Sequence, residues 1–322
     1  MARVLVSAPL PGPAVDSLRG LHDVRVGSEP TGLGRDGILA ALGELGGDID
    51  ALITIVTDRV DEAVLRAAPR LKIVGNCGVG VDNIDLAACR QRGVLVTNTP
   101  EVLTDATADL TFALILAACR RVSEGDRLVR SGRWRGFSMT ELLGVRATGA
   151  TLGIVGLGRI GRAVAKRAQG FSMRVLYTQR RRAPEEVERD LNAEHCDLET
   201  LLKQCDIVAL CCPLTPETRG LLSRERIAMM KPGAVVVNTS RGACIDERAL
   251  AEALAEGRLS AAGLDVYERE PHVEAALLAS ERVVLLPHIG SADVSTRETM
   301  ARLAVEAVRA ALEGKEPKHR VV

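Results

Sequence analysis

Three side chains of complementary chemistry, Arg241, Glu270 and His288, each come shortly after a short apolar run in the second half of the sequence. Because the carboxyl ends of parallel strands lie along one edge of a sheet, we expect these side chains to lie close together. A guanidinium group could bind a carboxylate and polarise the carbonyl beside it, and an imidazole could give a proton to the developing alkoxide. A carboxylate would orient the imidazole and favour its protonated form. The set indicates hydride transfer to a 2-oxo acid.

A glycine-rich turn could hold the cofactor that such a transfer requires. The apolar run 152–155 leads directly into Gly156-Leu157-Gly158-Arg159-Ile160-Gly161, which matches the pattern G-x-G-x-x-G. In this pattern the first glycine allows a tight turn, the second lets a pyrophosphate approach the backbone, and the third allows close packing of helix on strand. The start of the next helix, expected over 162–169, would favour the phosphate charge. The pattern predicts a dinucleotide site.

The end of the next apolar run, 173–178, indicates which dinucleotide binds. An NAD site usually has an acidic residue here, which hydrogen-bonds the ribose 2′-hydroxyl. In this chain Gln179 takes that position, and Arg180, Arg181 and Arg182 follow it. Because guanidinium groups bind phosphate and no carboxylate would repel it, we expect NADP(H) to be preferred, with NAD(H) possible. The alternative is that the three arginines form a solvated surface.

Composition argues against several classes of partner. The 42 basic and 42 acidic side chains cancel, and only six residues are aromatic, so we expect no nucleic acid partner. The most apolar stretch, 110–119, is about half a membrane span, and the first ten residues are too short and too broken by proline for a signal peptide. The eight cysteines are scattered, without a metal-ligand pattern. We therefore expect a cytoplasmic protein with no metal site and no membrane association.

Short apolar runs alternate with helical patterns along the whole chain, which predicts the α/β class with parallel sheets covered by helices on both faces. The expected strands are 4–6, 51–55, 73–76, 94–98, 153–155, 174–177, 207–210, 234–238, 262–265 and 283–286. The expected helices include 61–67, 84–90, 105–118, 198–203, 246–256 and 294–312.

The dinucleotide unit begins near residue 151, so a complete set of strands and helices precedes it. We expect two doubly wound, Rossmann-like domains with a cleft between them. The dinucleotide-binding domain would comprise residues 100–289. The substrate-binding domain would be discontinuous, made of residues 1–99 and 290–322, because the last helix follows the final strand of the cofactor domain and could cross back.

Seven motifs occur in an order that is far more specific than any one of them. They are Asn76–Asp85, Thr97–Leu110, the glycine motif 156–161, Pro213–Thr218, Val237–Gly242, Gly263–Pro271 and Pro287–Ala292. Through them the chain resembles the D-isomer-specific 2-hydroxyacid dehydrogenases over essentially its whole length. Within that family it is most similar to the glyoxylate/hydroxypyruvate reductases.

The resemblance implies a role for each motif. Arg241, Glu270 and His288 take the catalytic positions, and Val56 would face the small side chain of the substrate. Backbone N–H groups of a glycine turn would hold the substrate carboxylate. The implied substrate site consists of Val56, Gly78, Val79, Gly80 and Arg241. The implied cofactor contacts are Thr104, Gly156, Leu157, Gly158, Arg159, Ile160, Gly161, Gln179, Arg180, Arg181, Cys212, Pro213, Thr218, Thr239, Asp265, His288 and Gly290.

The resemblance implies an NAD(P)H-dependent reductase that converts glyoxylate to glycolate and hydroxypyruvate to D-glycerate, with His288 as general acid. Such enzymes are homodimers joined through their cofactor domains. Two alternatives remain: a D-3-phosphoglycerate dehydrogenase lacking a regulatory domain, and a dinucleotide-sensing binding protein similar to a corepressor. The same scaffold serves formate and phosphite dehydrogenases, which the chain resembles less.

Two segments depart from the reductase pattern. Residues 132–139 form a shorter stretch than the aromatic-rich segment that shapes the partner's active site in glyoxylate reductases, so a somewhat larger 2-oxo acid could fit. Cys211 and Cys212 stand where less reactive residues are common. They are either two small buried hydrophobic residues or a redox-active pair.

Overall fold

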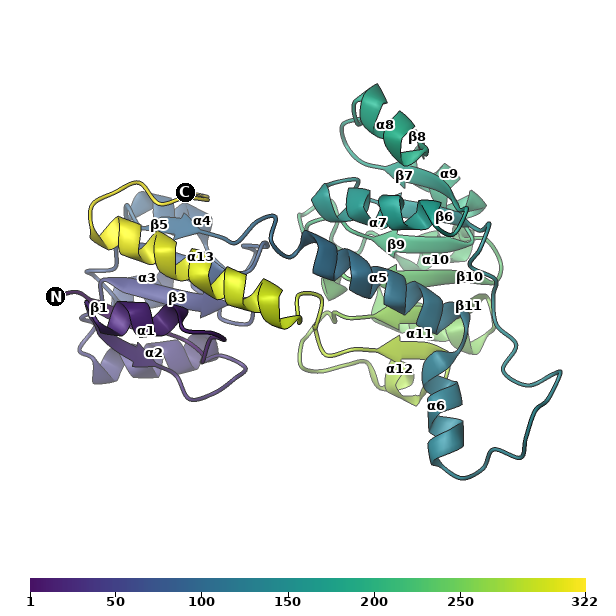
Figure 1. Ribbon diagram of the computed structural model, residues 1–322, viewed down its shortest axis with the longest axis horizontal. Helices are drawn as coiled ribbons and strands as arrows, with labels where there is room; N and C mark the ends of the chain where they lie inside the picture. The colour runs from purple at the N-terminus through teal and green to yellow at the C-terminus, as the bar shows by residue number, and fades with distance from the viewer. The chain divides into compact units, whose positions relative to one another are not determined.

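The computed structural model describes residues 1–322, and the chain divides into two compact units (Figure 1). Unit 1 combines Met1–Leu103 with Ser291–Val322, and unit 2 is Thr104–Gly290. The expected boundaries, 99/100 and 289/290, lie close to these positions. The assignment of substrate binding to unit 1 and of cofactor binding to unit 2 stays a prediction at this point.

Unit 1 is built on a parallel five-stranded sheet in the order β2-β1-β3-β4-β5. The strands are β1 (Arg3–Val6), β2 (Asp23–Val26), β3 (Ala51–Ile55), β4 (Ile73–Cys77) and β5 (Leu95–Thr97). Successive side chains alternate between two apolar clusters, so each face of the sheet needs its own cover of helices.

The helices of unit 1 divide between these two faces. One face is covered by α2 (Gly34–Glu44), α3 (Glu62–Ala67) and α4 (Leu86–Gln91), and the other by α1 (Ala14–Arg19) and α13 (Val294–Leu312). Figure 1 shows α13, in yellow, lying along this second face. A Cβ on Gly75 in β4 would lie 3.0 Å from Cγ2 of Val308, so a glycine allows the close approach of α13.

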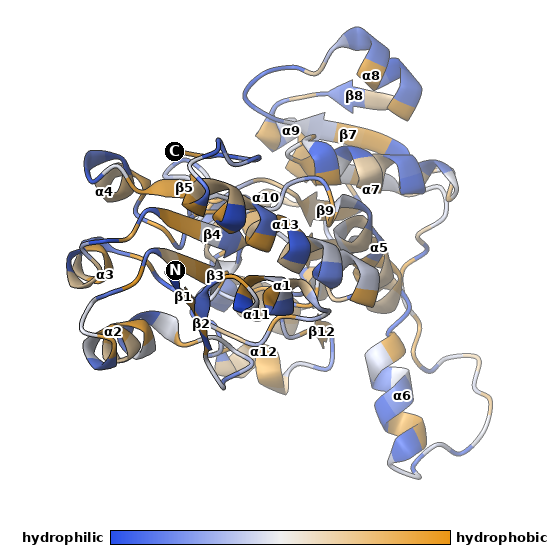
Figure 2. Cartoon of the chain, turned by 60° about the vertical axis from the view of Figure 1, so that its left-hand side comes forward, coloured by the Kyte–Doolittle hydropathy of each residue, from blue (hydrophilic) through white to orange (hydrophobic).

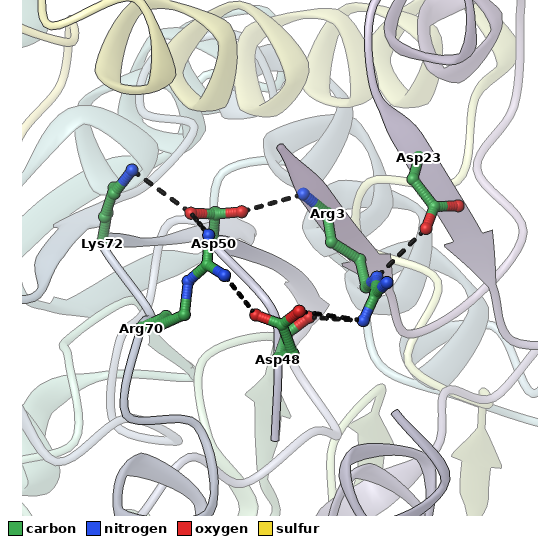
Figure 3. A network of polar contacts seen from close by, with 6 residues as sticks. All are labelled: Arg3, Asp23, Asp48, Asp50, Arg70 and Lys72. Atoms are coloured by element: carbon green, nitrogen blue, oxygen red, sulfur yellow. Dashed lines mark hydrogen bonds and ion pairs between the residues drawn. The ribbon is translucent and has the colours of Figure 1, made fainter. Parts of the chain in front are cut away.

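A polar network closes the amino-terminal edge of this sheet (Figure 3). Its centre is Asp50, which is buried. The carboxylate of Asp50 accepts a hydrogen bond from the N–H of Arg3 at 2.9 Å and forms an ion pair with Lys72 at 3.2 Å. Arg70 bridges Asp50 and Asp48, at 3.4 and 2.7 Å. Burial alone would raise the pKa of Asp50, but the hydrogen bonds and charges around it lower the pKa below its usual value. The hydrogen bonds and positive charges around Asp50 therefore outweigh the effect of its burial and keep its carboxyl group ionised.

Unit 2 is built on a parallel seven-stranded sheet in the order β12-β11-β10-β9-β6-β7-β8. The order reverses between β6 and β9, which are neighbours, and ligands of such sheets bind beyond the carboxyl ends of the strands at this point. The strands are β6 (Thr151–Val155), β7 (Arg174–Thr178), β8 (Ala193–His195), β9 (Ile207–Leu210), β10 (Ala234–Asn238), β11 (Leu259–Leu264) and β12 (Val283–Leu285).

Helices cover both faces of this second sheet as well. Two apolar clusters, one on each face, make up the core of unit 2. The helices are α5 (Thr104–Cys119), α6 (Val122–Arg130), α7 (Arg159–Gln169), α8 (Glu185–Leu191), α9 (Leu198–Gln204), α10 (Arg224–Met229), the 3₁₀ turn Gly242–Cys244, α11 (Glu247–Ala255) and α12 (Ala275–Ala279). None of the helices in the chain is both long enough and apolar enough to cross a membrane.

The predicted fold class, two doubly wound parallel α/β units, is confirmed. Two edge strands, β2 and β8, were not expected, because they are short and half exposed and so lack a continuous apolar run. Helix α7 begins at Arg159, three residues before the expected start at residue 162, with Gly158 as its N-cap. The expected helix 294–312 matches α13, which packs on β4 and α1 in unit 1.

Candidate active site

The glycine turn between β6 and α7 leaves open space at one of its three glycines. Gly156 has φ +96°, and a Cβ on it would lie 2.9 Å from Cα of Cys212. A Cβ on Gly161 would overlap the carbonyl oxygen of Gly156. Around Gly158 no atom lies within 4 Å of the Cβ position. The chain's own packing thus requires the first and third glycines, while the second leaves room at the start of α7, which fits the pyrophosphate of a dinucleotide.

The end of β7 carries an amide and not a carboxylate. Oε1 of Gln179 accepts the N–H of Leu157 at 3.0 Å, which ties this position to the glycine turn. Arg180, Arg181 and Arg182 are all exposed, but Arg182 is held in an ion pair with Glu188 of unit 2. The three consecutive arginines are therefore not equivalent, and only the first two remain available to a ligand.

The loop after β10 fixes the backbone of Arg241. Asn238, the last residue of the strand, is fully buried, and its Nδ2 donates to the carbonyl of Arg241 at 2.9 Å. Its Oδ1 accepts the N–H and the hydroxyl of Ser240 at 3.0 and 2.8 Å. A Cβ on Gly242 would overlap the backbone of Tyr267, so only glycine allows this loop to lie against the loop that follows β11. This contact brings Arg241 beside the segment that carries Glu270.

The imidazole of His288 is paired with Glu270. Nδ1 of His288 lies 2.8 Å from Oε2 of Glu270, and Oε1 of Glu270 accepts the N–H of Tyr267 at 3.0 Å. Burial alone would raise the pKa of Glu270, but the hydrogen bond and charge of His288, the N–H of Tyr267 and the charge of Arg241 lower it overall. Glu270 is therefore a carboxylate at neutral pH, and it binds one ring nitrogen of His288 while Nε2 lies on the opposite side of the ring.

Asp265, the residue after β11, holds the turn that carries His288. Its buried carboxylate accepts the N–H of Ile289 at 2.7 Å and the N–H of Gly290 at 2.8 Å. Its carbonyl accepts the N–H of His288 at 2.9 Å. His288 has φ +53°, in the left-handed region that few residues other than glycine adopt. Burial raises the pKa of Asp265 although both N–H groups and the charge of His288 oppose the increase. Asp265 is thus the support of the His288 turn.

The remaining expected cofactor residues also lie in unit 2, around the point where the strand order reverses. Cys212 is buried beside Gly156, and Oγ1 of Thr218 donates to the carbonyl of Pro213 at 2.7 Å. Burial raises the pKa of Cys211 to about 12, and a hydrogen bond with Cys244 together with burial raises the pKa of Cys212. Both shifts disfavour the reactive thiolate and support the interpretation of this cysteine pair as packing residues. The expected positions in this region are Thr104, Leu157, Arg159, Ile160, Cys212, Pro213, Thr218 and Thr239.

The loops expected to bind substrate lie in unit 1, after the adjacent strands β3 and β4. Thr54 pairs with Asn76 in the sheet, so Val56 and Gly78 follow at neighbouring strand ends. A Cβ on Gly78 would lie 2.6 Å from Cγ1 of Val56. The structure thus brings these two predicted residues into direct contact.

The side chains of two asparagines, Asn76 and Asn83, hold the backbone of this region. Nδ2 of Asn76 donates to the carbonyl of Gly80 at 2.8 Å, and its Oδ1 accepts from Nδ2 of Asn83 at 3.2 Å. The N–H of Gly78 donates to the carbonyl of Asn76 at 2.9 Å, so it is not available to a carboxylate as the sequence had led us to expect. The N–H groups of Val79 and Gly80 form no hydrogen bond within the chain. Two of the three expected amide donors therefore remain for an anion.

Sequence reasoning did not identify the residues that support the site. Asn76 and Asn238 lie within the quoted motifs, and Asp265 was expected only as a cofactor contact. The available signal was a polar residue at the end of a continuous apolar strand, where burial requires each polar atom to find a partner.

Comparison with known proteins gives a consistent assignment. The model of the family described as D-isomer specific 2-hydroxyacid dehydrogenase, NAD binding domain, matches residues 112–290. The chain is 45% identical to the glyoxylate reductase of Thermococcus litoralis, over 99% of this chain and 96% of that protein.

Two solved structures are similar over nearly all of their length. The TT0316 protein from Thermus thermophilus is 48% identical, with a TM-score of 0.90 and coverage of 99% of this chain and all of that one. An NADPH-dependent glyoxylate/hydroxypyruvate reductase from Sinorhizobium meliloti, solved with NADP and malonate, is 31% identical with a TM-score of 0.87, covering 100% and 97% of the two chains. The predicted family is confirmed, and this chain belongs to the D-isomer-specific 2-hydroxyacid dehydrogenases, which are NAD(P)-dependent enzymes.

Proposed function

We propose that this protein reduces small 2-oxo acids, glyoxylate to glycolate and hydroxypyruvate to D-glycerate, with NADPH as the preferred hydride donor. The pair of His288 and Glu270, at 2.8 Å, is the observation that carries the proposal, because it supplies an oriented proton donor. The names of the relatives agree with it: one is a glyoxylate reductase, and another is an NADPH-dependent glyoxylate/hydroxypyruvate reductase.

Each step of the reaction has a residue to perform it. A bound nicotinamide cofactor would supply the hydride that the carbonyl carbon receives. The free N–H groups of Val79 and Gly80 bind the substrate carboxylate, and Arg241 binds the carboxylate and polarises the carbonyl. Nε2 of His288 gives its proton to the alkoxide oxygen, while Glu270 holds Nδ1 and stabilises the charged ring.

The preference for NADPH rests on the residues after β7. Gln179 brings no negative charge toward a 2′-phosphate, and Arg180 and Arg181 are exposed donors of the kind that bind phosphate bidentately. All eight cysteines are free thiols, which supports a reducing compartment such as the cytoplasm as the place of action.

The proposed homodimer is supported by a segment of unit 2 that is not covered by the rest of its own chain. Helix α6 has no buried residue, and both Figure 1 and Figure 2 show it standing away from the sheet of its unit. After it, Trp134, Phe137 and Met139 are 55%, 88% and 77% exposed. Large exposed apolar side chains that lie close together in the sequence are typical of interaction surfaces, so we assign these three to the proposed dimer interface through the cofactor domains. A mass in solution of twice that of one chain would agree with this assignment.

Steady-state oxidation of NADPH and NADH with four acids in parallel tests the proposal. The acids are glyoxylate, hydroxypyruvate, pyruvate and 3-phosphohydroxypyruvate. We expect the highest kcat/KM for NADPH with glyoxylate or hydroxypyruvate. A maximum for NADH with the phosphorylated acid would assign the enzyme to phosphoglycerate oxidation instead. Turnover of none of the four would favour a dinucleotide-sensing binding protein.

A further inference from the structure

The third arginine after β7 is fixed by a glutamate of the next helix. Nε and Nη2 of Arg182 donate to Oε1 and Oε2 of Glu188, at 2.9 and 2.8 Å, in a bidentate pair. Arg182 and Tyr177 together hold the pKa of Glu188 at about 2, so this carboxylate is charged at every physiological pH. Arg180 and Arg181, which precede this pair in the same loop, are exposed.

A buried tyrosine joins this ion pair to the loop. The hydroxyl of Tyr177, in β7, donates to Oε1 of Glu188 and accepts the N–H of Ala183 at 2.9 Å. Tyr177 is fully buried, and its ring packs edge-on against the ring of His195 at 5.1 Å. One phenolic oxygen thus fixes both the glutamate and the far end of the loop.

The near end of the loop is fixed as well. Gln179 accepts the N–H of Leu157 from the glycine turn and donates to the carbonyl of Arg181 at 2.6 Å. The loop 179–183 is therefore held at both ends. The side chains of Arg180 and Arg181 form no hydrogen bond or salt bridge, and Arg180 interacts with Glu217 through its charge alone.

We propose that Tyr177, Glu188 and Arg182 form a brace, whose function is to hold the loop 179–183 in the shape that presents Arg180 and Arg181 to the 2′-phosphate of NADPH. The three are positioning residues for cofactor selectivity, and this role rests on the proposed preference for NADPH. A loop that is already ordered loses less conformational entropy when its donors bind, so the brace increases affinity for the phosphate without contacting it.

The brace can be tested by binding, without turnover. Isothermal titration calorimetry of the full chain would compare adenosine 2′,5′-bisphosphate with 5′-AMP, which lacks the 2′-phosphate. We expect the wild type to prefer the bisphosphate by about tenfold or more, and Arg180→Ala with Arg181→Ala to remove the preference. Tyr177→Phe and Arg182→Ala should each reduce the preference by about three- to tenfold, with the affinity for 5′-AMP unchanged.

A matched control lies at the other end of the same strand. Arg174 makes an equally bidentate pair with Glu194, at 3.2 and 2.7 Å. Arg174→Ala should therefore remove an ion pair of similar geometry but leave the preference for the bisphosphate unchanged. A full preference in Tyr177→Phe and Arg182→Ala, with wild-type melting temperatures, would overturn the brace.

Hydrogen exchange separates this inference from the proposed cofactor preference. Amide exchange of peptides covering 178–184 in the ligand-free protein should be faster in Tyr177→Phe than in the wild type. Faster exchange in Tyr177→Phe, together with no preference for the bisphosphate in the wild type, would refute the preference for NADPH and retain the brace as a structural element. Unchanged exchange in Tyr177→Phe would refute the brace itself.

Discussion

Cγ1 of Val56 lies 2.6 Å from the position that a Cβ on Gly78 would occupy. The Val56 side chain therefore fills the space that a side chain on Gly78, in the adjacent loop, would need. Val56 is the residue assigned to the substrate's side chain, and Gly78 begins the turn assigned to its carboxylate. A change in the size of either residue therefore changes the shape of both loops. This contact makes the pair a direct test of substrate binding in unit 1.

The first prediction concerns Gly78→Ala. The added methyl group has to displace Val56, and overpacking of this kind costs about 1–3 kcal/mol. We expect KM for glyoxylate to rise about tenfold, with KM for NADPH unchanged. The double variant Gly78→Ala with Val56→Ala should recover most of this loss, because removing Cγ1 makes room for the methyl group. Additive effects of the two substitutions would show that the contact does not matter for substrate binding.

The second prediction concerns the proton donor. His288→Gln should lower kcat by about a hundredfold or more, because general acid catalysis contributes that much. Glu270→Gln should also lower kcat, since an amide cannot stabilise the charged ring. The exposed neighbour Glu268 offers a control, and Glu268→Gln should turn over like the wild type. Wild-type turnover in His288→Gln would refute the assignment of His288 as the general acid. The dissociation constant of NADPH serves as the control for the folding of unit 2, and we expect it to be unchanged.

Much of this site could be predicted from sequence because its residues follow continuous apolar strands. The ends of parallel strands meet at one edge, so Glu270 and His288 could be expected to meet, and they lie 2.8 Å apart. The glycine motif was equally informative, because close packing requires Gly156 and Gly161 while Gly158 leaves room for a ligand. The short strands β2 and β8 were missed because half-exposed edges do not have continuous apolar runs.

The roles that could not be predicted depend on hydrogen-bond and ion-pair partners that the spacing of residues in the sequence does not reveal. In the sequence Arg182 is indistinguishable from the two arginines before it, but in the structure it pairs with Glu188 of α8. The sequence indicated that the N–H of Gly78 would bind substrate, but in the structure it donates to the carbonyl of Asn76. Asp265 reads as a ligand contact, yet its carboxylate accepts two N–H groups from the His288 turn.

The third prediction concerns acid stability and the network in Figure 3. The pKa of Asp50 in the folded chain is below its usual value of 3.8. Its contribution to stability is therefore fully present above that value and is lost as the pH falls through the folded pKa. Asp50→Asn should destabilise the chain by about 2 kcal/mol at pH 7, since hydrogen bonds to charged groups contribute about 1.5–3 kcal/mol.

Urea unfolding followed by circular dichroism, at pH 7 and below pH 4, measures this effect. The difference between wild type and Asp50→Asn should shrink at the lower pH, because the carboxyl group is then increasingly protonated. Asp23 provides the control, since its single ion pair with Arg3 is largely exposed and should contribute less than about 1 kcal/mol. A difference between wild type and Asp50→Asn that is independent of pH would contradict the electrostatic origin.

The fourth prediction concerns the support of His288. Asp265→Asn replaces one acceptor oxygen with an amide that points its own N–H groups at the N–H of Ile289 or Gly290. The turn that carries His288 at φ +53° should then relax, and kcat should fall by about tenfold or more with a smaller change in KM. Asp246→Asn is the control, because Asp246 caps α11 and asparagine caps a helix equally well. Wild-type kcat in Asp265→Asn would mean that the turn does not need this support.

The fifth prediction concerns cofactor choice and uses the bond between Gln179 and Leu157. Glutamate has the same length as glutamine, so Gln179→Glu keeps an oxygen within reach of the Leu157 N–H and adds a negative charge where the 2′-phosphate would lie. Combined with Arg180→Ala, it should lower kcat/KM for NADPH by about a hundredfold and raise that for NADH, because a carboxylate repels the phosphate and accepts a hydrogen bond from the 2′-hydroxyl. Steady-state kinetics with both cofactors and saturating glyoxylate measures the ratio. An unchanged ratio would mean that Arg180 and Gln179 do not contact the ribose, and that the preference arises elsewhere in unit 2.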